Sequence, residues 1–140
     1  MSEVLNGRDE SVTDITINLT SKITQDNDTE TFTRIAPGKM TEDGDIIRIS
    51  YAEEGAIPVK VLLKDDKLLI RRGVDHNNYS FMKFVPGEKE SCRYVVEGRQ
   101  MDMVSVTNLL EYTEDEGSHK LRVEYDLFNG LYLIGNYAVT

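Results

Sequence analysis

The chain has 140 residues, a formal net charge of −9 and a single cysteine, Cys92. This length suits one domain that buries a substantial hydrophobic core. Hydrophobic residues make up 39% of the chain and charged residues 29%, a balance typical of a folded soluble protein and not of a disordered one. No apolar run approaches the roughly 20 residues that a membrane-spanning helix needs.

The start of the chain and the charge balance restrict location and partners. The stretch "MSEVLNGRDE" has neither the basic nor the apolar region of a secretory signal, and one cysteine permits no internal disulfide, so we expect a cytoplasmic protein. Acidic residues outnumber basic ones by 25 to 16, which disfavours nucleic acid and anionic membranes as partners. A small-molecule ligand and a homodimer remain as expected partners.

Alternation with period two dominates the sequence, and this period predicts β-strands. The first example is "DITINLTSKI", in which Ile15, Ile17 and Leu19 share one face while polar residues occupy the other. We expect residues 1–10 to form a flexible tail and residues 11–140 to form a single β-domain. Further strands are predicted in the segments "TETFTRIA", "DIIRISY", "IPVKVLLK", "KLLIRRG", "YSFMKFV", "CRYVVE", "MDMVSVTNLLEY" and "KLRVEYDLF".

Turn signals separate these strands. "PGKMTEDG" is predicted to be a connection, and Asp65-Asp66 is predicted to form a tight hairpin. The final hairpin turns at Asn129-Gly130. A two-residue loop there would pair Tyr125 with Ile134, and a three-residue loop with Gly130 in a bulge would pair Leu127 with Leu131 and Tyr125 with Leu133. The second register keeps the apolar face intact, so we prefer it.

The segment from Met101 to Tyr112 carries apolar residues on both faces, which predicts either burial on both sides or a bulge that switches faces midway. In total about ten strands follow one another through short connections, which favours a sandwich or a barrel. A meander of this many strands removes its exposed edges most simply by closing. We therefore predict an all-β fold, a single closed or nearly closed up-and-down antiparallel barrel of about 8–10 strands.

A scattered set of residues resembles the pattern of a known family. It comprises Arg71 or Arg72 with Gly73, then Met82, Phe84, Gly87, Tyr94 and Gly98, and the closing run "LRVEYDLFNGLYLIGNYAV" is similar to the family's last hairpin. The chain thus resembles the YwiB-like family of uncharacterised bacterial proteins over roughly residues 11–139. The resemblance implies a small cytosolic barrel of lipocalin-like, calycin-type architecture and no defined biochemical function. The chain has no tryptophan, so the Gly-x-Trp signature of true lipocalins is missing.

The two adjacent arginines are the most informative polar residues. The Asp65-Asp66 hairpin predicts that Val59 pairs with Arg72 and Lys60 with Arg71. Alternation then places Arg72 on the apolar face, whereas the family pattern would select Arg71 as the inward residue; we prefer the alternation. An inward guanidinium needs a carboxylate, a group of carbonyls or an anionic ligand, unless it reaches solvent at the barrel rim.

No set of residues predicts catalysis. His76 follows Asp75 in a loop with no nucleophile nearby, and His119 follows a polar loop. The two histidines have no acid or cysteine at ligand spacing, so we expect neither a metal site nor a cofactor. Cys92 shares a face with Tyr94 and Val96 and is expected to be a buried core residue.

Three functions are compatible with this sequence. The leading hypothesis is a non-enzymatic barrel that binds a small or partly apolar ligand in its interior or mouth. The candidate ligand contacts are Arg72, Arg71, Tyr94, Tyr79, Met101 and Met103. The alternative is a solid-core module that acts through its surface or by self-association. An enzyme ranks last, because no nucleophile, base and orienting group can be placed together.

Overall fold

The computed structural model describes residues 12–53, 57–73, 75–129 and 132–140. The tail expected at residues 1–10 lies outside these ranges. Within them every regular element is a β-strand, and there are ten. The strands are β2 (Thr13–Gln25), β3 (Asp28–Asp43), β4 (Ile46–Glu53), β5 (Ile57–Lys64), β6 (Lys67–Gly73), β7 (Asn78–Phe84), β8 (Lys89–Val96), β9 (Arg99–Asp115), β10 (Ser118–Asn129) and β11 (Tyr132–Val139).

Each strand pairs with its neighbours in the sequence, and β11 returns to pair with β2, so the sheet closes into an antiparallel up-and-down barrel. The seam between β11 and β2 is short, running from Asn136↔Thr24 to Val139↔Ser21, and two backbone bonds between Thr20 and Thr140 extend it. The predicted fold class is therefore confirmed. Among the described residues, no helix is long and apolar enough to cross a membrane.

Side chains from the inner face pack into one core. Phe84 is 1% exposed, and its ring lies 4.5 Å from that of Tyr125, which stacks on Tyr137 at 5.0 Å. Burial raises the pKa of the Tyr125 hydroxyl far above its ordinary range. The buried members of the cluster are Met40, Ile47, Leu63, Leu68, Met82, Phe84, Cys92, Met103, Val123, Tyr125 and Leu127.

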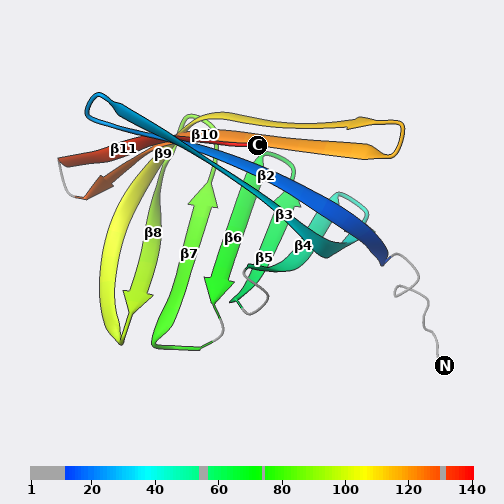
Figure 1. Ribbon diagram of the computed structural model, residues 1–140, viewed down its shortest axis with the longest axis horizontal. Helices are drawn as coiled ribbons and strands as arrows, with labels where there is room; N and C mark the ends of the chain where they lie inside the picture. Colours follow the sequence, from blue (N-terminus) through cyan, green and yellow to red (C-terminus); the bar gives the residue numbers. More distant parts are fainter. Residues whose placement is uncertain (1–11, 54–56, 74, 130–131) are drawn as a thin grey trace.

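Strand β9 contains a bulge, which is one of the two alternatives predicted for the segment from Met101 to Tyr112. Glu124 pairs with Leu109 but Tyr125 pairs with Thr107, so Asn108 is an extra residue in β9. Such a bulge bends a strand and shifts which side chains face inward. Figure 1 shows the consequence: β9 rises beside β8, then turns and runs with β10 across the ends of β4 to β7. The tip of the β9–β10 hairpin thereby reaches the turns at that end of the barrel.

Two predictions were wrong. "PGKMTEDG" is not a connection, because β3 continues to Asp43. Pro37 is tolerated within β3 because β4 pairs with β3 only from Gly38 onward, so Pro37 has no partner strand on that side.

Neither proposed register of the last hairpin occurs. Tyr125 pairs with Tyr137, and Ile134 is an extra residue in β11 between Gly135 and Leu133. Gly130, the predicted bulge residue, lies outside the described residues.

Candidate functional site

Arg72 lies on the inner face of the barrel, as alternation predicts. The hairpin register is the predicted one, with Val59 opposite Arg72 and Lys60 opposite Arg71. The Arg72 Nε donates a hydrogen bond to Oε1 of Glu53, and Arg34 Nη1 lies 3.0 Å from the other oxygen, Oε2. Glu53 is 8% exposed, so one nearly buried carboxylate is bound by two half-exposed arginines. The partner that Arg72 requires is thus a side chain of this barrel.

Replacing Arg72 by methionine should lower the free energy of unfolding by about 1–2 kcal/mol, because Glu53, which is poorly hydrated, then keeps Arg34 as its one ion-pair partner among the described residues. The neighbouring Arg71→Met is the matched control, since Arg71 is exposed on the other face and its loss should cost less than about 0.5 kcal/mol. Urea unfolding of both variants measures the difference. Equal losses would show that Glu53 does not depend on Arg72.

The other predicted ligand contacts divide between the two faces. Tyr94 faces inward and donates to Met82 Sδ at 3.2 Å, and burial raises the pKa of its hydroxyl to about 12. Met103 is buried in the core, whereas Met101 is half exposed at the end of β9. Tyr79 lies on the outer face, where the Arg71 guanidinium sits 4.8 Å from its ring centroid. The six residues therefore form no single site.

One row of residues crosses eight strands on the outer face. Each member is the Cα partner of the next, in the order Asp14, Lys39, Ser50, Lys60, Arg71, Phe81, Arg93 and Asp102. We call its four cations, Lys39, Lys60, Arg71 and Arg93, the basic row.

Aspartates pair with the two outer cations of the basic row. Lys39 donates to Asp14 at 2.7 Å, a contact that lowers the pKa of this carboxyl, and Arg93 Nε lies 3.8 Å from Asp102 Oδ1. Lys60 and Arg71 occupy the middle and face each other directly across two strands. Like charges in that position repel, and the chain as a whole is strongly acidic.

A groove of ≈ 440 Å³ lies along the basic row. Its cations are Lys39, Arg48, Lys60 and Arg71. Its outward-facing apolar side chains are those of Leu62, Leu69 and Phe81, Thr41 and Ser50 add two hydroxyls, and Ile49 and Val61, which pack against the core, also border it. Among the described residues that line it there is no carboxylate. A second cavity of ≈ 450 Å³ continues past Arg71 and Phe81 to Tyr79, Ser91, Cys92, Arg93 and Asp102. We call the first cavity the outer groove.

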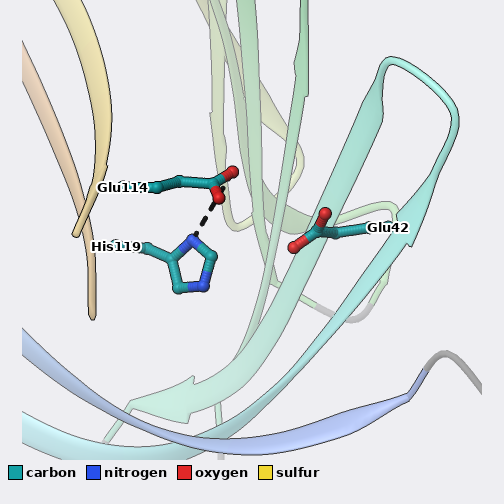
Figure 2. A group of neighbouring side chains, drawn as sticks. All are labelled: Glu42, Glu114 and His119. Atoms are coloured by element: carbon teal, nitrogen blue, oxygen red, sulfur yellow. Dashed lines mark ion pairs between the residues drawn. The ribbon is translucent and has the colours of Figure 1, made fainter. Parts of the chain in front are cut away.

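A different group gathers at the mouth of the barrel, under the hairpin tip. Glu42 at the end of β3, Glu114 in β9 and His119 in β10 place one carboxylate or imidazole atom each within 4.8 Å of the others. Figure 2 shows the two carboxylates facing each other, with the imidazole beside the space between them. We call these three residues the mouth cluster. The donor types are those of a metal site.

Tyr112 organises the mouth cluster. Its hydroxyl donates to Glu114 Oε1 at 3.2 Å and lies 2.6 Å from His119 Nδ1. Partial burial, followed by the nearby Glu114 and Glu42, raises the pKa of Tyr112 to about 12. A cavity of ≈ 260 Å³ adjoins it, lined by Asp45, Ile47, Leu63, Asp65, Asp66, Leu110 and Tyr112.

The sequence reasoning missed the basic row and the mouth cluster. The pairing of Glu114 with His119 could have been found, because the turn between them fixes the register of β9 and β10. Glu42 could not, since it comes close only through the bend at Asn108. The basic row needed seven strand registers at once, and only the β5–β6 register was predicted in advance.

Comparisons with known proteins agree with this architecture. A family model described as "Domain of unknown function (DUF1934)" matches residues 17–140. Among solved structures, the ywiB protein from Bacillus subtilis is similar, with a TM-score of 0.79 and 20% sequence identity over 92% of this chain and 90% of that chain. No curated protein matches the chain. Because the family model spans the barrel from β2 to its last strand, the chain belongs to the DUF1934 family, the YwiB-like family that its motifs resembled.

Proposed function

We propose that this protein is a non-enzymatic binding protein and that its ligand is a small molecule with an anionic group and an apolar body, held in the outer groove. The observation that supports this most strongly is the pair of facing cations, Lys60 and Arg71, in a groove to which the described part of the chain contributes no carboxylate. The interior is less suited because the barrel's own side chains pack the core, and three aspartates line the cavity at the mouth, which disfavours an anion there.

The charge arrangement favours an anion. In a chain of net charge −9, four cations collect on one strip, and the two central ones face each other. An anionic group between Lys60 and Arg71 would replace their repulsion with two charge-assisted hydrogen bonds. Arg71 is also partly oriented before binding, since its guanidinium lies over the Tyr79 ring. Preorientation lowers the entropy lost on binding.

The size and lining of the outer groove favour an apolar body for the rest of the ligand. Its volume of ≈ 440 Å³ falls within the range of small-molecule sites. Leu62, Leu69 and Phe81 form its floor on three adjacent strands. Its described lining residues offer hydroxyls and cations but neither an imidazole nor a carboxylate to act as a base, which supports binding over catalysis. A barrel that has a filled core and binds through its outer face also agrees with the alternative hypothesis of a solid-core module.

The test uses octyl phosphate as the probe, below its micelle concentration, in isothermal titration calorimetry. Wild type should bind it. The double variant Lys60→Gln/Arg71→Gln should bind about tenfold more weakly or worse, because two charged contacts are lost. Lys120→Gln/Arg122→Gln is the matched control; it makes the same charge change on β10 and should leave the affinity unchanged.

Two further probes separate the parts of the proposal. Octyltrimethylammonium, which has the same chain and the opposite charge, should not bind, and inorganic phosphate should bind more weakly than octyl phosphate. Equal affinity for both octyl compounds would overturn the anionic requirement. Loss of binding in both double variants would show a general charge effect. Binding to anionic vesicles without binding to monomeric octyl phosphate would replace the small ligand with a membrane surface.

A further inference from the structure

We propose that the mouth cluster binds a divalent first-row transition-metal ion, such as Zn²⁺, and that the ion fastens the β9–β10 hairpin tip to the end of β3. The proposal is independent of the outer groove, which lies on the other face of the sheet. It rests on the convergence of Glu42, Glu114 and His119 from three strands: β9 and β10 pair with each other up to their hairpin turn, whereas β3 pairs with neither of them.

One tautomer of His119 leaves a ring nitrogen for a metal ion while keeping the contact with Tyr112. Tyr112 has one hydroxyl proton, and it is donated to Glu114 Oε1. The Tyr112 oxygen also lies 2.6 Å from His119 Nδ1, and in the tautomer with its proton on Nδ1 the imidazole donates this hydrogen bond. In a neutral imidazole this leaves the lone pair on Nε2. A metal-binding histidine is ordinarily held in this way, with the other ring nitrogen donating to a fixed partner.

The donor types select the class of ion. Two carboxylates and an imidazole suit Zn²⁺ and its first-row neighbours, whereas Ca²⁺ takes about six to eight oxygen ligands and Mg²⁺ retains most of its waters. Three protein ligands would leave a fourth position for water. The location also favours a cation: Glu42 and Glu114 face each other in an acidic chain, and Asp45, Asp65 and Asp66 line the adjoining cavity.

Binding requires only a small contraction. Zinc–ligand distances of roughly 2.0–2.2 Å place neighbouring donors of a tetrahedral site about 3.3–3.6 Å apart. One ligand atom from each residue of the mouth cluster lies within 4.8 Å of the others, His119 Nδ1 lies 3.9 Å from Glu114 Oε1, and all three residues are exposed. Rotation of the two glutamate side chains can close the difference without moving the strands. Because the ligands belong to β3 and to the hairpin, the bound ion should also hold these two parts together.

The experiment measures Zn²⁺ binding to the full-length, tag-free chain by calorimetry and follows the unfolding temperature at increasing ZnCl₂. Wild type should bind one Zn²⁺ and unfold at a higher temperature. Mg²⁺ and Ca²⁺ at the same concentrations should raise it much less. No binding of Zn²⁺, or equal responses to all three ions, would overturn the proposal.

Variants locate the ion. His119→Gln and Glu42→Gln should each abolish the Zn²⁺-dependent rise in unfolding temperature. His76→Gln is the matched control, because His76 is the only other histidine and lies in the exposed β6–β7 loop. Tyr112→Phe removes the hydroxyl that contacts both His119 Nδ1 and Glu114 Oε1, so it frees both ligand side chains to move and should weaken binding about tenfold. Retention of the rise in His119→Gln, or its loss in His76→Gln, would show that Zn²⁺ binds elsewhere.

Discussion

Phe84→Ala should lower the free energy of unfolding by about 3–5 kcal/mol, the largest effect of any single truncation proposed for this barrel. Phe84 is 1% exposed, and its ring contacts Tyr125, which stacks on Tyr137. These three rings come from β7, β10 and β11, so together they reach across the barrel. Each of those strands is hydrogen-bonded to a neighbour on both sides, so the wall cannot collapse into the void.

Urea unfolding measures this loss, with Phe32→Ala as control because Phe32 is 52% exposed. The control should change stability by less than about 0.5 kcal/mol. A loss below about 1.5 kcal/mol for Phe84→Ala would indicate a loosely packed or hydrated interior. That outcome would restore the barrel interior as the leading ligand site and weaken the case for the outer groove.

Gly73→Ala should lower the free energy of unfolding by about 2–4 kcal/mol, through backbone strain together with a steric clash. Gly73 has a φ of +113°, and a Cβ there would lie 2.4 Å from the Asn78 carbonyl oxygen and 2.8 Å from Tyr79 Cα. Both are backbone atoms of the paired strand, so relief requires the β6–β7 junction to shift. Such a shift would also move Arg71 relative to Tyr79.

Gly44→Ala separates the two causes. Gly44 also has a positive φ, +61°, but no atom lies within 4 Å of the position of an added Cβ. Its loss should be about 1 kcal/mol, from the backbone conformation alone. Urea unfolding of both variants gives the comparison. Equal losses at the two positions would mean that the close approach of β6 to β7 contributes nothing.

The parts of the fold that could be predicted are those set by local pattern. Alternation gave the strands, and the two-residue Asp65-Asp66 turn fixed the register that places Arg72 inside and Arg71 outside. The last hairpin failed because Ile134 is an extra residue in β11, and period-two alternation carries no signal for where such a residue falls. Pro37 suggested the end of a strand. A strand accepts proline where no neighbouring strand pairs on one side, and the pattern of a single sequence does not show that β4 pairs with β3 only from Gly38 onward.

The candidate sites were less predictable than the strands because they depend on long-range geometry. Arg72 was correctly expected to need a partner, but Glu53 belongs to β4, which is separated from β6 by β5. Glu42 meets His119 only because β9 bends at Asn108 and carries the hairpin over the mouth. The local pattern of a single sequence predicts strands and hairpin registers, but it does not predict which side chains of non-adjacent strands come into contact.

The ligand should bind on the outer face and not inside the barrel, and the methyl resonances of adjacent leucines distinguish these two locations. Leu62 and Leu69 line the outer groove, whereas their chain neighbours Leu63 and Leu68 are buried in the core. On addition of octyl phosphate to methyl-labelled protein, the Leu62 and Leu69 signals should shift strongly while those of Leu63 and Leu68 stay nearly fixed. Shifts confined to Leu63 and Leu68, or no shifts at all, would show that the outer groove is not the ligand site.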